Sequence, residues 1–153
     1  MKKLIYLFVM AMLVNGCATT ITPSTPLQRK VIESKELEGT YEDTFKSTIS
    51  ILQDKGYQIT NSDYSGGIIS AEYSNSIAYG GSESYSATIN FEKFTENRIR
   101  MRLSIYKQLY NSIGAKRLKF SGLTSGIVNE PKLYQDFYNE IQKEIFLRSQ
   151  FKK

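Results

Sequence analysis

The chain has 153 residues with 20 Lys+Arg against 15 Asp+Glu, a net charge of +5, one cysteine and no histidine. This length suits one domain, and a single cysteine cannot form an internal disulfide. Because histidine is the most common general base and metal ligand, its absence argues against an enzyme and against a metal or other cofactor.

The first seventeen residues have the pattern of a secretory signal. Lys2 and Lys3 precede an apolar run from Leu4 to Val14, and these eleven residues fall short of the roughly 20 needed to cross a hydrocarbon core. The following Leu13-Val14-Asn15-Gly16-Cys17 resembles the lipobox of bacterial lipoproteins, although Asn15 stands where Ser, Ala or Thr is more usual. An ordinary secreted protein with an incidental Cys17 is the alternative.

The lipobox resemblance implies that residues 1–16 are a signal peptide that is removed, and that Cys17 is acylated and holds the protein to membrane lipid. Ala18 follows instead of Asp, which by resemblance to enterobacterial sorting implies an outer-membrane anchor with the domain facing the periplasm. Inner-membrane retention and surface exposure remain open. Without Lys2 and Lys3 the chain has 18 Lys+Arg against 15 Asp+Glu, a net charge of +3 that gives no indication of nucleic-acid binding.

Residues 17–39 are predicted to be the lipidated Cys17 and a flexible tether, and residues 40–153 a single domain. Residues 18–27 are rich in Thr, Ser and Pro, as in extended linkers. Residues 28–38 are ambiguous, because Val31 and Ile32 fit either an edge strand or a continued tether.

The domain is predicted to begin with a helix. Thr40 is a good N-cap and Asp43 stands three residues later, as in a capping box. Apolar residues then recur at helical spacing at Tyr41, Phe45, Ile49 and Leu52. Gly56 followed by Tyr57 predicts a Schellman motif at the end of this helix.

Strands are predicted at 57–60 and 68–74, with a turn at 61–67 and a mobile hairpin tip at 75–83. A hairpin of 85–91 and 99–105 follows, with its apolar residues at odd positions in both strands. Keeping both sets on one face requires a loop with an odd number of residues, and a three-residue loop within 94–97 is predicted. The other face carries Thr88, Asn90 and Glu92 opposite Arg98, Arg100 and Arg102, so the sheet is antiparallel and covered on one side.

Residues 107–128 are harder to interpret, and 115–120 fit a short fifth strand or an irregular return. Pro131 suits the first residue of a second helix that ends near Arg148. Its apolar stripe is Leu133, Tyr134, Phe137, Tyr138, Ile141, Ile145, Phe146 and Leu147. The predicted fold is α+β, a two-layer domain in which an N-terminal and a C-terminal helix cover one face of an antiparallel sheet of four to five strands.

This pattern also resembles small bacterial envelope lipoproteins, and the helix-grip modules of the lipoprotein C-subunit of the β-barrel assembly machinery. The residues that carry the resemblance are Thr40-Tyr41, Phe45, Leu52, Gly56-Tyr57-x-Ile59, Asp63 and Gly67-x-Ile69-x-Ala71. They are mostly cap, stop and core residues within roughly 40–147. The resemblance therefore implies the fold and a non-enzymatic envelope protein, and it carries no catalytic residues.

The candidate partner contacts are Arg98, Arg100, Arg102 and Tyr79. The three guanidinium groups suit phosphate or carboxylate partners, although a solvated strand face paired with Glu92 is the simpler interpretation. Tyr79 lies in the Gly-rich tip and is a typical interface residue. Tyr73 and Tyr85 share the apolar parity and fit the edge of the core.

The expected function is a lipid-anchored binding or assembly module for another envelope component, in the first place a protein. The alternative is a carrier or sensor of amphipathic ligands in a cavity between helices and sheet. That cavity would be lined by Phe45, Ile49, Phe91, Met101 and Phe137. Asp63 with Glu72, and Asp136 with Glu140, fit turn and surface positions better than paired catalytic acids.

Overall fold

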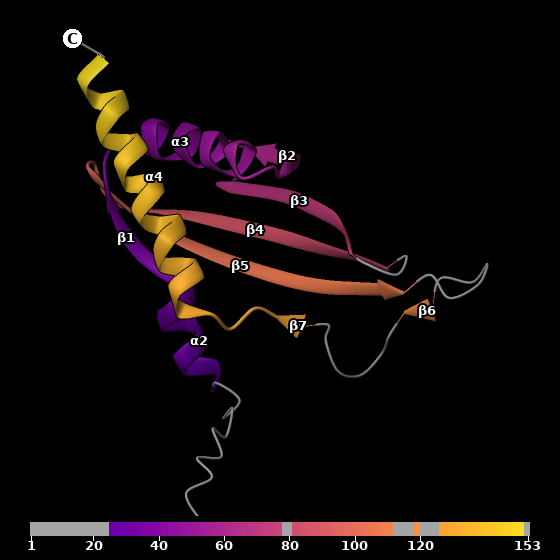
Figure 1. Ribbon diagram of the computed structural model, residues 1–153. Helices are drawn as coiled ribbons and strands as arrows, with labels where there is room; N and C mark the ends of the chain where they lie inside the picture. The colour runs from indigo at the N-terminus through magenta and orange to yellow at the C-terminus, as the bar shows by residue number, and fades with distance from the viewer. Residues whose placement is uncertain (1–24, 78–80, 112–117, 120–125, 152–153) are drawn as a thin grey trace, which may run out of the picture.

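The computed structural model describes residues 25–77, 81–111, 118–119 and 126–151 (Figure 1). The elements are α2 Pro26–Glu33, β1 Ser34–Glu38, α3 Tyr41–Asp54, β2 Gln58–Asp63, β3 Ile68–Ile77, β4 Gly81–Thr95, β5 Arg98–Asn111, β6 Leu118–Lys119, β7 Gly126–Ile127 and α4 Pro131–Phe151. The predicted signal peptide, Cys17 and Tyr79 lie outside the described residues.

The sheet is antiparallel with strand order β1-β5-β4-β3-β2, and the short β6 and β7 pair with β5. Helices α3 and α4 contact each other and share one hydrophobic core with the sheet (Figure 1). The predicted two-layer α+β class is therefore confirmed.

Helix α3 begins and ends at the predicted residues. The Thr40 hydroxyl oxygen accepts a hydrogen bond from the Asp43 N–H at 3.2 Å. At the other end the Tyr57 N–H donates to the Leu52 carbonyl and the Gly56 N–H to the Gln53 carbonyl, both at 2.9 Å. Gly56 has φ +83°, so the predicted Schellman motif is present.

The odd-position rule holds for the β4–β5 hairpin. Six of the eight apolar residues at odd positions are at most 1% exposed, namely Ala87, Ile89, Ile99, Met101, Leu103 and Ile105, and the remaining Tyr85 and Phe91 are half-buried. The additional residue that keeps both sets on one face, however, does not come from a three-residue loop. The register shifts between Lys93 and Thr95, and a two-residue turn at 96–97 follows. A bulge therefore supplies the residue that keeps both apolar sets on one face.

The strands are longer than predicted. β2 continues to Asp63, and residues 64–67 form the predicted turn. β3 and β4 extend to Ile77 and Gly81, so residues 75–77 and 81–83 of the predicted tip are strand. Ser74 pairs with Ser84, and Ser76 with Ser82. Such residues have weak strand preference, but pairing to a neighbour overrides that preference.

Residues 26–38 are not a tether, because they form α2 and β1. The edge-strand alternative for 28–38 is confirmed for residues 34–38 but is wrong for Val31 and Ile32, which lie in α2. Thr25 and Gln28 make a reciprocal capping box that starts α2, with Pro26 at its first position. β1 pairs with β5, and Leu37 is 1% exposed in the core. Only one of five β1 residues is fully buried, so the sequence pattern of this strand is weak.

Helix α4 buries most of the predicted stripe: Tyr134, Phe137, Tyr138, Ile141 and Ile145. Phe146 is 60% exposed and Leu147 42% exposed, so the stripe is narrower than predicted. Each residue advances about 100° around a helix, and residues directly after Ile145 therefore turn away from the core. The helix also continues past Arg148 to Phe151.

Two tyrosines of α4 complete the outer edge of β5. β1 pairs with residues 98–102 of β5, and β7 pairs with residues 106 and 107 of the same strand. Residues 103–105 of β5 therefore have neither strand beside them. The Leu103 N–H donates to the Tyr138 hydroxyl and the Ile105 N–H to the Tyr134 hydroxyl, each at 3.3 Å. These hydroxyls in turn donate to the carbonyls of Glu33 at 2.5 Å and Val128 at 2.9 Å. Helix α4 thus fills a gap in the sheet edge.

Candidate interaction surface

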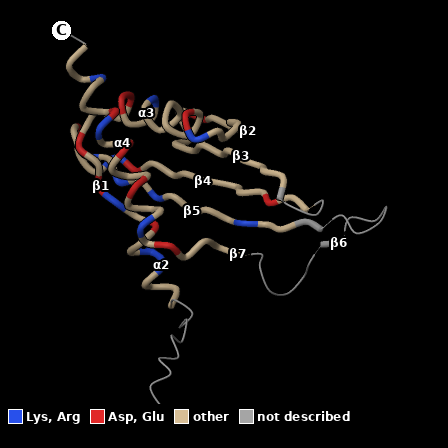
Figure 2. The backbone as a smooth tube through the Cα atoms, in the orientation of Figure 1, with Lys and Arg blue, Asp and Glu red and all other residues tan. Residues whose placement is uncertain are grey.

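Arg98, Arg100 and Arg102 lie on the face of β5 away from the helices, because they alternate with the buried Ile99, Met101 and Leu103. β1 lies beside them and places Glu38, Glu36 and Ser34 opposite the three arginines in that order. In Figure 2, charged residues of both signs are interleaved at this end of the sheet, while the far parts of β3 and β4 are mostly uncharged.

Two of the three arginines are neutralised within the protein. Arg100 lies 3.1 Å from Glu36 and 3.5 Å from Glu92, so the predicted cross-strand partner is confirmed. Arg102 contacts the Glu33 carboxylate at 3.0 Å. Among the described residues the ion pairs of this row involve Arg100 and Arg102, and Arg98 is left exposed. The row therefore holds α2 and β1 to β5, and Arg98 is its remaining candidate for a partner.

The Glu33–Arg102 pair predicts unequal effects of its two partners. The Glu33 side chain is 5% exposed and that of Arg102 is 47% exposed. Arg102→Met leaves a buried carboxylate without its cation, and we expect a loss of about 1–3 kcal/mol in the free energy of unfolding, discounted for the exposure of Arg102. Glu33→Gln leaves Arg102 half in water and should cost under about 1 kcal/mol.

Urea unfolding of both variants beside Arg98→Met, an exposed arginine of the same row, checks this prediction. If Arg102→Met and Arg98→Met lowered the free energy of unfolding equally, the Glu33–Arg102 ion pair would not hold α2 to β5.

A second surface is a row of side chains that crosses the sheet, here called the tyrosine row: Tyr57, Tyr73, Tyr85 and Lys107. Ring centroids of Tyr57 and Tyr73 lie 5.6 Å apart, and those of Tyr73 and Tyr85 lie 6.0 Å apart. The Lys107 ammonium lies 5.0 Å from the Tyr85 ring centre and 2.9 Å from Glu83. Hydrogen bonds to Tyr85 and Glu83 raise the pKa of Lys107.

The tyrosine row lies where the sheet leaves the cover of the helices. Tyr57 follows the end of α3 and contacts Phe137 at 6.1 Å between ring centroids, while β3, β4 and β5 continue past both helices (Figure 1). Tyr57, Tyr73 and Tyr85 are half-buried. The predicted position of Tyr73 and Tyr85 at the core edge is therefore confirmed, and the sequence did not reveal that they form a continuous row.

The tyrosine row gives an expected pH dependence. Burial, with the neighbouring Tyr85, Tyr134 and Tyr73, raises the pKa of Tyr57 from 10.0 to about 12. The folded state then favours the protonated phenol, so the contribution of Tyr57 to stability is fully present below pH 10 and is lost as the pH rises from 10 towards 12. Tyr57→Phe should make this alkaline loss less steep in urea melts at pH 9 to 12. An unchanged slope would contradict the burial of this phenol.

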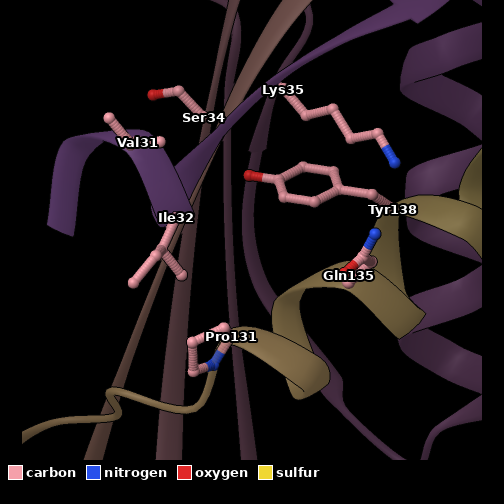
Figure 3. A pocket seen from close by; sticks show the side chains of 7 residues that line it. All are labelled: Val31, Ile32, Ser34, Lys35, Pro131, Gln135 and Tyr138. Carbon is pink, nitrogen blue, oxygen red and sulfur yellow. The ribbon is translucent and has the colours of Figure 1, made fainter. Parts of the chain in front are cut away.

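A third feature is a shallow hollow of 310 Å³ between α2, β1 and the start of α4 (Figure 3). It is lined by Val31, Ile32, Ser34, Lys35, Pro131, Gln135 and Tyr138. On the neighbouring surface of α2, Leu27 and Val31 are each 73% exposed and stand one turn apart. The first described helix therefore exposes two apolar side chains beside this hollow.

The four acidic residues Asp63, Glu72, Asp136 and Glu140 all lie at exposed positions, as predicted. Asp63 accepts hydrogen bonds from the Gly66 N–H at 2.9 Å and the Ser65 hydroxyl at 2.8 Å, which lower its pKa and hold its turn. Glu72 lies opposite Gln58 at the other end of the β2–β3 pair. Glu140 makes an ion pair with Lys55 at 2.7 Å.

The residues named for a ligand cavity belong to one packed hydrophobic cluster: Phe45, Ile49, Phe91, Met101 and Phe137. Phe45, Met101 and Phe137 are at most 5% exposed. Phe91 also lines a surface hollow of 410 Å³ beside Tyr64. The ligand-carrier alternative stays a prediction, and three of its five named residues are fully packed in the core.

Within the described ranges, no group of three His, Cys, Asp or Glu residues is placed to hold a metal ion. None of the helices described there is long and apolar enough to cross a membrane. A comparison with protein-family models finds no matching family, and a search of curated proteins finds no significant match.

Proposed function

We propose that this chain is a lipid-anchored lipoprotein of the bacterial outer membrane, whose domain is a non-enzymatic binding or assembly module for another envelope protein. The observation that carries the proposal is the sequence of Lys2-Lys3, the apolar run 4–14 and Gly16-Cys17. Each buried methylene of an acyl chain contributes about 0.8 kcal/mol, so two or more chains on Cys17 would anchor the protein stably.

The position of α2 supports an anchor at Cys17. The seven residues 18–24 separate Cys17 from the first described residue and can span at most about 25 Å when extended. The exposed Leu27 and Val31 would then face the lipid surface, with Lys30 beside them. A short helix with apolar and basic residues on its exposed side is typical of contact with a lipid headgroup layer.

The tyrosine row and Arg98 support a protein-binding role. Aromatic and arginine side chains are enriched at protein interfaces, and half-buried rings lose little conformational freedom when a partner covers them. The row crosses β3, β4 and β5, which continue past both helices (Figure 1).

Crosslinking of the full chain in the producing bacterium tests the binding role. We expect the wild-type protein to crosslink to a specific envelope protein, and Tyr73→Ser with Tyr85→Ser to reduce that product at least fivefold. Tyr106→Ser is the matched control, because Tyr106 is 39% exposed and lies on the opposite face of the sheet. The same loss with the control, or no specific product with the wild type, would contradict the proposal.

A further inference from the structure

The outer edge of β3 is only half covered. β2 pairs with β3 from Asp63↔Ile68 to Gln58↔Glu72, whereas β3 continues to Ile77 and pairs there with β4 on its other side. Among the described residues, no strand pairs with the outer edge of Tyr73–Ile77, here called the free edge (Figure 1). Alternate backbone N–H and C=O groups along these five residues are directed outward and can pair with another strand.

The other outer strands carry features that discourage such pairing, and the free edge does not. β1 has three charged residues among its five, Lys35, Glu36 and Glu38. β2 has a register shift between Ile59 and Asn61 and ends at Asp63. The free edge reads Tyr-Ser-Asn-Ser-Ile, with no charge and no proline, and its register with β4 is unbroken. An uncharged, regular edge is a template for strand addition.

The free edge is complementary to itself. If two copies pair antiparallel about a two-fold axis at Asn75, residue 73 faces residue 77, Ser74 faces Ser76 and Asn75 faces its own equivalent. No like charges meet, and two facing amides or hydroxyls can form hydrogen bonds. The self-matching order of the residues favours a second copy over an unrelated strand, because a two-fold interface must fit itself.

We propose that two copies of this chain form a symmetric dimer by antiparallel pairing of their free edges, Tyr73–Ile77, which joins the two sheets into one. The two-fold axis is perpendicular to the sheet, so the helices of both copies lie on the same face. The two tyrosine rows then adjoin and form one larger surface. The dimer goes beyond the proposed function, and it requires neither the anchor nor the envelope partner.

Cysteine crosslinking of the full chain in membranes of the producing bacterium tests the pairing. Asn75→Cys places two thiols across the axis, where directly paired residues have Cα atoms about 4.5–5.5 Å apart, within the range of a disulfide. We expect mild oxidation to give a disulfide dimer at ten or more times the yield of Ser62→Cys, an exposed position on β2. The wild-type protein, whose only cysteine is Cys17, shows how much disulfide dimer arises through Cys17. Equal yields at the two positions, or no dimer with Asn75→Cys, would overturn the proposal.

A second test, which does not depend on thiols, places a positive or a negative charge at position 75. Asn75→Lys and Asn75→Glu each put like charges on the axis, and purified full-length protein should shift at least tenfold towards monomer in sedimentation experiments. Asn75 is exposed, so neither change disturbs the core. A mixture of the two variants should recover the dimer as a heterodimer. Dimerisation of Asn75→Lys alone at the wild-type level, a monomeric wild type, or exclusive pairing of this edge with a different protein would overturn the proposal.

Discussion

Leu37→Ala is expected to lower the free energy of unfolding by about 3 kcal/mol, the usual cost of removing a fully buried leucine side chain. Leu37 is 1% exposed on β1, lies opposite Ile99 of β5 and belongs to the main hydrophobic cluster. The lost transfer energy and the cavity left beneath the helices both contribute. Urea unfolding followed by far-ultraviolet circular dichroism measures the change.

Leu27→Ala is the matched control for this prediction. It is the same chemical change ten positions earlier, at a residue that is 73% exposed, and it should alter stability by less than about 0.5 kcal/mol. The pair of variants asks whether residues 26–38 are part of the folded domain or a tether. If both variants were as stable as the wild type, β1 would not be part of the core.

The combined variant Tyr134→Phe, Tyr138→Phe should lose about 2–5 kcal/mol, even though it removes only two oxygen atoms. Without them the N–H groups of Leu103 and Ile105 and the carbonyls of Glu33 and Val128 lose their partners. A buried polar group left without a partner costs about 1–3 kcal/mol. Burial also raises the pKa of Tyr134 and of Tyr138, as expected for phenols that remain protonated inside the protein.

Hydrogen exchange gives this prediction a local measurement. The amides of Leu103 and Ile105 should exchange faster in the double variant than in the wild type by a larger factor than the amides of Ile89 and Ala87, which lie on β4 away from α4's hydroxyls. Tyr106→Phe, outside this gap, should leave both stability and exchange near wild type. A uniform change at all four amides would indicate general destabilisation and contradict the edge-filling role.

Local signals in the sequence predicted most of the fold. Thr40 and Gly56 mark the ends of α3 because caps depend on neighbouring residues only. The odd parity of the β4–β5 hairpin fixed its buried face, since a slip of one residue would turn every side chain over. Features set by distant partners were missed. β1 has one buried apolar residue, and the Ser- and Asn-rich ends of β3 and β4 become strand by pairing with each other.

The same division applies to the candidate surface. Strand alternation placed Arg98, Arg100 and Arg102 on the open face correctly. Their neutralisation depends on Glu33 and Glu36, which lie more than sixty residues earlier in the chain and pair only after β1 joins the sheet. The tyrosine row likewise brings together Tyr57, which precedes β2, and residues of β3, β4 and β5. The alternation pattern of one strand does not show which residues of other strands will lie beside it, so the sequence did not reveal these contacts.

The most direct test of the proposed function is the intact mass and N-terminal peptide of the protein extracted from membranes of its own bacterium. We predict that the chain begins at Cys17 and that this residue carries fatty acyl groups on its sulfur and its amino nitrogen. Cys17→Ala should abolish both the processing and the membrane retention. A wild-type chain that begins at another residue, or an unmodified Cys17, would contradict the proposed anchor and the envelope role that depends on it.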